Sequence, residues 1–151
     1  MIKDIVTDTV LLSFKCVECN LEDPLLSKEI NHLINTAFYY RSKCAGLAFN
    51  QIGILKRGFV FKVFNLSNDN LSKDYKVIIN PIYIMKSPTV KSRFESCLSR
   101  PNEKAIKKRR SVKIKIEYYD WEVKEIKKEK FVGFDARVIQ HEIDHLNGIL
   151  I

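Results

Sequence analysis

Two histidines near the end of the chain have the spacing of a metal site. His141 and His145 stand four residues apart with Glu142 beside the first, so the segment reads H-E-x-x-H. On a helix, side chains four residues apart lie on one face, roughly 5–6 Å apart at Cβ, and both rings can reach one metal ion. Glu142 would then lie close enough to a water on that metal to act as a general base in hydrolysis. A third ligand is needed, because such sites keep three protein ligands and one open position.

Cys97 is the candidate for this third ligand. It lies in the short motif E-S-C-L-S over residues 95–99, and a thiolate with two imidazoles leaves the fourth metal position to water. Cys16 and Cys19 form a single C-x-x-C without the second pair that a zinc ribbon needs, so we interpret them as structural. Cys44 is interpreted as a packing residue, because a fourth protein ligand would occupy the position of the water.

Composition indicates one ordinary globular domain over residues 1–151. Hydrophobic residues make up 46% and charged residues 29% of the chain, as in soluble proteins. No apolar stretch is long enough for a signal peptide or a membrane span, so we expect a cytoplasmic protein without disulfides. The net charge is +8, and the basic run K-K-R-R at residues 107–110 could attract an anionic partner. Without a nucleic-acid motif beside it, this run is more simply a solvated face.

Periodicity indicates which elements hold these residues. Apolar residues recur every three or four positions over residues 27–41, which predicts a helix with Ser27 as its N-cap. Residues 2–14 are expected to form a short extended or irregular entry. The last helix is expected to open at Gly133 and Phe134 and to carry the H-E-x-x-H motif on its inward face.

Strands are expected between these helices. Residues 59–64 and 77–79 are apolar runs, the first followed by a turn at residues 67–70 and the second ended by Asn80 and Pro81. The clearest alternation of apolar and charged residues opens a hairpin over residues 112–132. Together these elements predict an α+β fold, with antiparallel-rich sheets packed around the C-terminal helix.

Three motifs, in this order, resemble those of the peptide deformylase family. The family's G-x-G-L-A-A-x-Q stands here as C-A-G-L-A-F-N-Q over residues 44–51, its E-G-C-L-S as E-S-C-L-S over residues 95–99, and its Q-H-E-x-D-H as Q-H-E-I-D-H over residues 140–145. The resemblance covers residues 44–151, and the earlier part of the chain more loosely. It implies an enzyme that removes the formyl group from the N-terminal formyl-methionine of newly made proteins and releases formate.

The resemblance also implies roles for the matching positions. Cys97, His141 and His145 would bind one divalent metal, usually Fe²⁺ in this family and often replaced by Zn²⁺, Ni²⁺ or Co²⁺. Glu142 would move protons as the general base, and the Gln51 side chain and the Leu98 backbone N–H would hold the oxyanion. Glu95 and Asp144 would orient the groups around the metal. Residues implied on the substrate side are Gly46, Ala45, Glu95, Phe134, Arg137 and Val138.

Three positions depart from the family's motifs and leave an alternative open. Cys44 and Ser96 replace glycines, and Phe49 replaces an alanine, so each adds bulk near the expected site. The alternative is a deformylase-like protein that binds formyl-Met peptides or the ribosome without turnover. An H-E-x-x-H endopeptidase is a third hypothesis, which the six residues after His145 disfavour because they contain no further ligand.

The expected partners follow from this resemblance and from the charge. They are N-formyl-methionyl nascent peptides, with a transient ribosome contact through the basic surface, and neither a membrane nor a specific nucleic acid. We expect a monomer. The chain ends soon after the last motif, which favours a short form without a C-terminal extension, as a virus-encoded deformylase could have.

Overall fold

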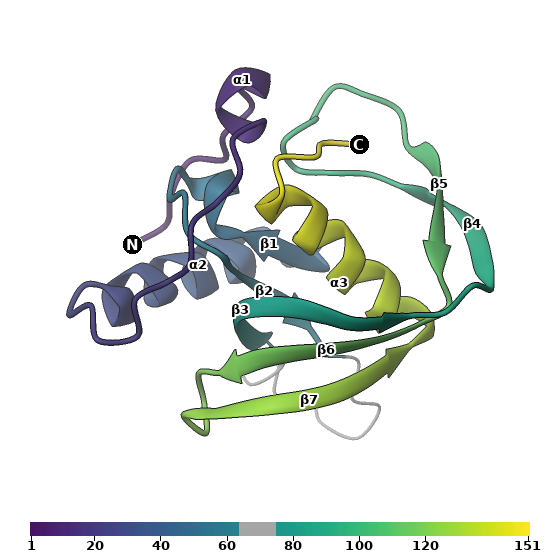
Figure 1. Ribbon diagram of the computed structural model, residues 1–151. Helices are drawn as coiled ribbons and strands as arrows, with labels where there is room; N and C mark the ends of the chain where they lie inside the picture. The colour runs from purple at the N-terminus through teal and green to yellow at the C-terminus, as the bar shows by residue number, and fades with distance from the viewer. Residues whose placement is uncertain (64–74) are drawn as a thin grey trace.

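The computed structural model describes residues 1–63 and 75–151. The turn expected at residues 67–70 and the end of the strand expected at Phe64 lie outside the described residues. The elements, labelled in Figure 1, are α1 (Thr9–Leu12), α2 (Leu26–Tyr39), β1 (Gly46–Ala48), the 3₁₀ helix η1 (Phe49–Ile52), β2 (Gly58–Lys62), β3 (Tyr75–Lys86), β4 (Val90–Glu95), β5 (Ile106–Ser111), β6 (Lys113–Asp120), β7 (Glu125–Val132) and α3 (Gly133–Leu146).

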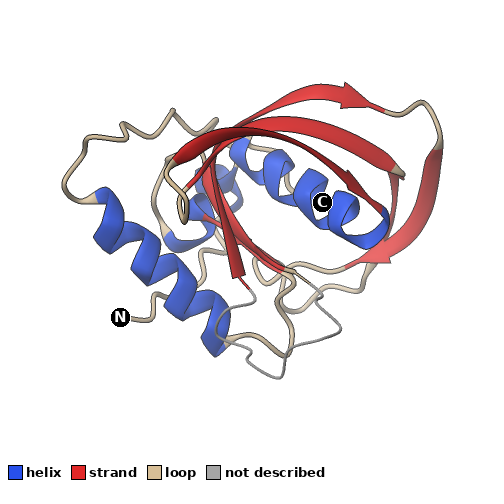
Figure 2. Ribbon diagram, turned by 90° about the horizontal axis from the view of Figure 1, so that it is seen from below, coloured by secondary structure: helices blue, strands red, loops and turns tan. Residues whose placement is uncertain are grey.

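Two antiparallel sheets surround the last helix. One has five strands in the order β1-β2-β3-β6-β7, and the other consists of β4 and β5. Helix α3 lies inside the curve of the strands, whereas α2 lies outside it (Figure 2). The predicted α+β fold is therefore confirmed, as are the hairpin of β6 and β7 and the start of the last helix at Gly133.

The sheet buries apolar side chains on both of its faces. Along β6, Ile114, Ile116 and Tyr118 are buried while the charged residues between them point outward, as the alternation predicts. These three residues pack with Ile139 and Ile143 of α3 in one core cluster. A second cluster lies between α2 and the β1–β3 end of the sheet, formed by Ile30, Leu33, Val60, Val77 and Ile79 among others. Each such side chain contributes about 1.5–3 kcal/mol when it is fully buried.

The strand predicted to end at Asn80 and Pro81 continues to Lys86. The ladder between β3 and β6 shifts register between Ile79 and Ile82 and then resumes. Asn80 adopts a positive φ of 51°, which asparagine tolerates, and its side chain bonds the backbone N–H and C=O of Cys19 at 2.8 and 3.0 Å. The predicted end of the strand at Asn80 and Pro81 was wrong. Pro81 has no N–H to donate to the ladder, but it lies in a β-bulge, where this donor is not needed.

Two helix predictions also need correction. Residues 2–14 contain α1, whose short first turn is capped by the Asp8 carboxylate, which accepts the N–H groups of Val10 and Leu11. Helix α2 begins at Leu26, so Ser27 lies inside it and is not its N-cap. The turn before it is held instead by Asp23, which accepts the N–H of Leu25 at 2.9 Å. Among the described residues, every helix is too short or too polar to cross a membrane.

Candidate metal centre and active site

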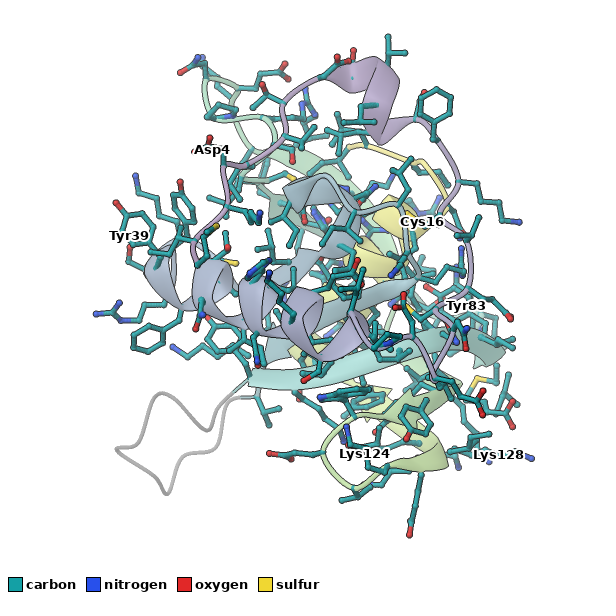
Figure 3. All side chains as sticks on the ribbon, turned by 90° about the vertical axis from the view of Figure 1, so that its left-hand side faces the viewer. Asp4, Cys16, Tyr39, Tyr83, Lys124 and Lys128 are labelled. Carbon is teal, nitrogen blue, oxygen red and sulfur yellow. The ribbon has the colours of Figure 1, made fainter. Side chains whose placement is uncertain are left out.

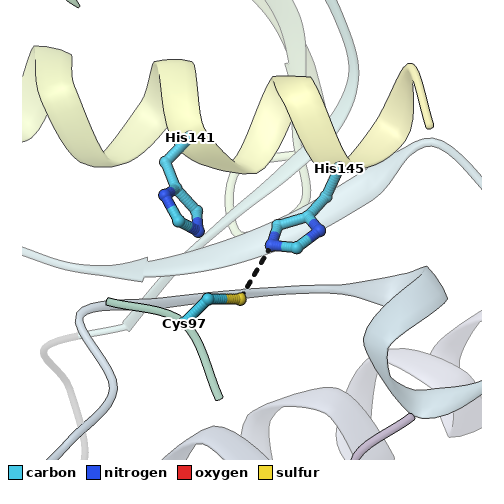
Figure 4. A group of neighbouring side chains, drawn as sticks. All are labelled: Cys97, His141 and His145. Atoms are coloured by element: carbon cyan, nitrogen blue, oxygen red, sulfur yellow. Dashed lines mark hydrogen bonds between the residues drawn. The ribbon is translucent and has the colours of Figure 1, made fainter. Parts of the chain in front are cut away.

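Cys97, His141 and His145 come together between α3 and the loop after β4 (Figure 4). Their ligand atoms all lie within 4.8 Å of one another, and Cys97 Sγ is 3.3 Å from His145 Nε2. In the described part of the chain, no other group of three His, Cys, Asp or Glu side chains converges in this way. One thiolate and two imidazoles suit a divalent transition metal and leave a coordination position for water. The donor set therefore fits the expected metal.

Glu95 fixes the orientation of His141. Its Oε1 lies 2.9 Å from His141 Nδ1 and also accepts from Arg110, while Oε2 accepts from Arg110 at 3.1 Å and from Arg137 at 2.5 Å. Burial alone would raise the pKa of Glu95, but the hydrogen bonds from His141 and Arg110 outweigh it and hold the pKa well below its usual value. Glu95 lines the pocket, yet protein donors occupy both oxygens, so it lies behind His141 and is no free polar contact for a substrate.

Arg110 is buried. The interpretation of residues 107–110 as a solvated face is therefore wrong at this residue. Its side chain is 6% exposed and pairs with both Glu95 and Asp144. The burial alternates along β5, with Lys107 and Arg109 exposed and Lys108 half-buried. A run of like charges on a strand is divided between its two faces, and the sequence motif alone does not say which face is inward.

The pKa values of His141 and His145 are shifted in opposite directions. Burial lowers the pKa of His145 to about 3, and the charges of His141 and Arg110 act in the same direction. Burial would also lower the pKa of His141, but its hydrogen bonds to Cys97 and Glu95 prevail and raise that pKa to about 10. His145 is therefore held neutral, the form in which imidazole binds metals.

Glu142 points into the same site, and its Oε2 atom accepts no hydrogen bond from the described residues. The side chain is buried, and its Oε2 has no hydrogen-bond partner among the described residues, as is true of His145 Nδ1. Burial raises the pKa of Glu142 to about 7, a value at which a carboxylate both accepts and returns a proton near neutral pH. The geometry thus provides a proton-transfer group beside the metal ligands.

Gln51 and Leu98 face this site from the other side. Gln51 lies in η1, where its Oε1 accepts the Ala48 N–H at 3.0 Å, and this bond turns its Nε2 toward Cys97 Sγ at 3.5 Å and Ser99 Oγ at 3.1 Å. Leu98 follows the ligand cysteine and lines the same pocket. Both predicted oxyanion residues therefore line the expected reaction centre, with Gln51 Nε2 donating to Cys97 and Ser99 in this structure.

The predicted substrate-side residues line one pocket with the metal ligands. Ala45, Gly46, Phe134, Arg137 and Val138 all belong to its wall, together with Cys97, His141 and Glu142. A Cβ atom on Gly46 would lie only 2.7 Å from Glu142 Oε1 and 2.9 Å from Val138 Cγ1. Glycine is therefore needed where β1 passes over α3.

The three departures from the family's motifs leave this pocket open. Phe49 is fully buried in the second core cluster, and its ring fits because Gly58 has no side chain: a Cβ there would lie 2.7 Å from the ring. Cys44 is buried and its Sγ donates to the Gly46 carbonyl at 3.1 Å; burial raises its pKa to about 12, so the thiol stays neutral. Ser96 is exposed at the pocket rim.

Sequence reasoning missed three polar residues that hold the site, Arg110, Gln140 and Asn50, and gave a fourth, Arg137, only a place on the substrate side. Arg110 and Arg137 bond Glu95, as described above. Gln140 bonds both the N–H and the C=O of Ser111, at 3.0 and 2.9 Å, and thereby ties α3 to β5. Asn50 donates to the His145 carbonyl at 2.7 Å. Gln140 and Asn50 stand inside the recognised motifs, next to His141 and Gln51, and this position was the available signal.

Comparisons with known proteins show to which family the chain belongs. A family model described as Polypeptide deformylase matches residues 2–151. The peptide deformylase of Clostridium beijerinckii is 38% identical over 151 residues, which is 100% of this chain and 100% of that protein. The peptide deformylase of Thermotoga neapolitana is 37% identical over 129 residues, which cover 85% of this chain and 71% of that protein.

Solved structures give the same result. The crystal structure of Thermotoga maritima peptide deformylase superposes with a TM-score of 0.83 at 32% identity, covering 99% of this chain and 95% of that one. A class I type b peptide deformylase from Acinetobacter baumannii, bound to Met-Ala-Ser, superposes with a TM-score of 0.85 at 25% identity, covering 99% and 96%. The chain therefore belongs to the peptide deformylase family, the divalent-metal-dependent hydrolases that remove the N-formyl group from newly made proteins.

Proposed function

We propose that Cys97, His141 and His145 hold the catalytic metal and that Glu142 is the general base. The convergence of the three ligand atoms within 4.8 Å is the observation that carries this proposal. A divalent metal bound there supplies Lewis-acid activation of a water for attack on the formyl carbon. The metal we propose is Fe²⁺; the donor set alone also suits Zn²⁺, Ni²⁺ and Co²⁺.

The chain's own residues then move the proton and hold the developing charge. Glu142 takes a proton from the attacking water through its unbonded Oε2 and delivers it to the amine nitrogen as the C–N bond breaks. Gln51 Nε2 and the Leu98 N–H donate to the oxyanion of the tetrahedral intermediate. The products are formate and a free N-terminal methionine.

The substrate is positioned by the pocket wall. We propose that the peptide runs extended beside Gly46 of the edge strand β1, where backbone groups pair with backbone. Ala45, Phe134 and Val138 contact the methionine side chain. Glu95 acts through His141, because its oxygens are fully bonded within the protein.

Formate release from formyl-Met-Ala-Ser tests these assignments. Protein loaded anaerobically with Fe²⁺ is compared with Glu142→Gln, which keeps the volume of the side chain but loses its basicity. We expect kcat to fall by about 10²–10⁴-fold with one metal still bound per chain. Peptide binding without formate release by the parent protein would instead establish the non-catalytic alternative. Parallel loading with Zn²⁺ and Ni²⁺ tests the choice of metal.

We further propose that the ribosome contact uses the lysine face, defined as Lys113, Lys115, Lys128 and Lys130 on the outer side of β6 and β7. Lys115 stands directly opposite Lys130 in the ladder, and like charges in this position are destabilising unless an anion lies near them. Lys128 points away from the sheet (Figure 3). Helix α3 and the pocket lie against the opposite face, so RNA phosphates on the lysine face would leave the pocket free for the nascent peptide.

Binding to ribosomal RNA at increasing salt tests this surface. In the double variant Lys115→Gln/Lys130→Gln we expect the slope of log affinity against log salt to shrink by about one per lysine removed, with formyl-Met-Ala-Ser turnover unchanged. Lys28→Gln, on α2, is the matched control. Equal slopes in parent and double variant would exclude the lysine face as the contact.

The remaining assignments concern the state of the chain. We propose that residues 1–151 act as one domain and as a monomer, since the three proposed metal ligands already converge within 4.8 Å of one another without a second copy. The site of action is then the compartment where formylated peptides emerge, a bacterial or infected-host cytoplasm or an organelle. Analytical ultracentrifugation at assay concentration tests the monomer.

A further inference from the structure

Arg137 makes an unusual set of bonds at the wall of the pocket. It lies on α3, four residues before His141, with its side chain 11% exposed. Its Nη1 donates to Glu95 Oε2 at 2.5 Å and to the Lys108 carbonyl at 3.1 Å, and its Nη2 donates to the Lys91 carbonyl at 2.7 Å. Lys91 belongs to β4 and Lys108 to β5. One side chain therefore bonds both strands of the small sheet and the carboxylate beside the metal site.

The small sheet carries one side of the pocket. Strands β4 and β5 pair only with each other among the described strands and stand apart from the five-stranded sheet (Figure 1). The end of β4 and the loop after it contribute Phe94, Ser96 and Cys97 to the pocket, opposite the residues of α3. The distance between this wall and α3 thus depends on the bonds that join them.

We propose that Arg137 is a positioning residue that clamps the small sheet onto α3 and thereby sets the width of the methionine pocket. This inference rests on the proposed function of that pocket. Glu95 keeps two donors from Arg110 and its bond to His141 when Arg137 is removed. Gln140 still ties Ser111 at the end of β5 to α3, and Arg110 still pairs with Asp144. Loss of the clamp therefore loosens the wall at Lys91 and Lys108, while His141 keeps its bond to Glu95.

The chemistry of the guanidinium explains why arginine stands here. Its planar group presents five donors in a fixed geometry, so it can bond a carboxylate and two carbonyls on separate strands at once. Lysine has the same charge, but its single ammonium cannot span these three acceptors. Leucine branches at Cγ and is wider there than the unbranched methionine side chain, so a pocket of fixed width distinguishes the two. A misfit of about one methylene is worth about 10–200-fold in such a pocket, and a wall that moves loses this discrimination.

Two substrates with different side chains test the clamp. Formate release is measured from formyl-Met-Ala-Ser and formyl-Leu-Ala-Ser with the parent, Arg137→Gln, Arg137→Lys and Arg109→Gln. In Arg137→Gln we expect the preference for Met over Leu in kcat/KM to fall about tenfold, mainly through a higher KM for the Met peptide. Arg137→Lys should fall between this variant and the parent. Arg109→Gln removes the same charge from an exposed position of β5 and should keep the parental preference.

Hydrogen exchange provides a readout that needs no turnover. In metal-loaded Arg137→Gln, amides of β4 and β5 should exchange faster than in the parent, while those of β2 and β3 stay unchanged. An unaltered Met/Leu preference, or an equal loss of kcat for both peptides, would overturn the clamp. If the parent releases no formate, the proposed function is wrong. The exchange rates of β4 and β5 still decide whether Arg137 holds the small sheet on α3. If Arg137→Gln does not fold, Arg137→Lys decides both measurements.

Discussion

Replacing Gly46 with alanine should displace Glu142 without touching any metal ligand. The added Cβ would lie 2.7 Å from Glu142 Oε1, and ordinary contact begins at 3.4 Å, so the carboxylate has to shift by about 0.7 Å. Val138 Cγ1 at 2.9 Å closes the other side, which prevents the alanine from moving that way. Since misplacing a catalytic group by 1 Å can cost about 100-fold, we expect kcat to fall by roughly 25-fold. Overpacking should also cost about 1–3 kcal/mol of folding stability.

Gly53→Ala is the matched control for this substitution. Gly53 has a φ of +82°, and the atom nearest to an added Cβ is Val6 Cγ2 at 4.0 Å, so alanine there is strained but meets open space. It should lose about 1–2 kcal/mol of stability and keep the parental kcat. Both variants are assayed for formate release and for urea unfolding with the metal content determined. A Gly46→Ala protein with kcat within about twofold of the parent would refute the tight packing of β1 on Glu142.

Three further predictions concern the fold around the site. Gly58→Ala should destabilise the protein by about 1–3 kcal/mol because its Cβ meets the Phe49 ring, and adding Phe49→Leu should recover part of this loss, as urea unfolding would reveal. Arg110→Met should cost about 3–5 kcal/mol because Glu95 and Asp144 lose their buried partner; a loss under 1 kcal/mol would contradict this. In the metal-free protein, burial raises the pKa of Glu142 from 4.5 to about 7, so the unfolded chain ionises first and stability falls as pH rises through that window. Glu142→Gln should therefore be more stable than the parent by on the order of 3 kcal/mol above pH 7, but not below about pH 4; equal stabilities above pH 7 would be inconsistent with this burial cost.

The periodic spacing of apolar residues predicted those helices and strands that bury one face and expose the other. Ile114 and Ile116 alternate with lysines and lie on the inner face of β6, and the spacing of His141 and His145 places both rings beside Cys97. The path of β3 through Asn80 and Pro81 was not predictable in the same way. Its continuation depends on Asn80 bonding the backbone of Cys19, which is 61 residues distant in the chain. Tertiary bonds of this kind leave no periodic signal.

The buried positions of Arg110 and Arg137 could not be predicted from the sequence either. Residues 106, 108 and 110 share the inner face of β5. Arg110 pairs with Lys91 in the ladder, and its long side chain reaches Glu95 and Asp144 from this face only in the folded sheet. A buried carboxylate such as Glu95, next to the proposed metal ligand His141, requires compensating cations, because an unpaired buried charge costs several kcal/mol. Glu95 in a ligand motif therefore implied that cations had to lie near it, and the chain offered candidates in residues 107–110 and in Arg137. Arg110 of β5 bonds the Glu95 carboxylate through both of its oxygens. Arg137 of α3 bonds Glu95 and also the backbone carbonyls of both small strands. Replacing Arg110 should therefore reduce folding stability, whereas replacing Arg137 should reduce the preference for methionine.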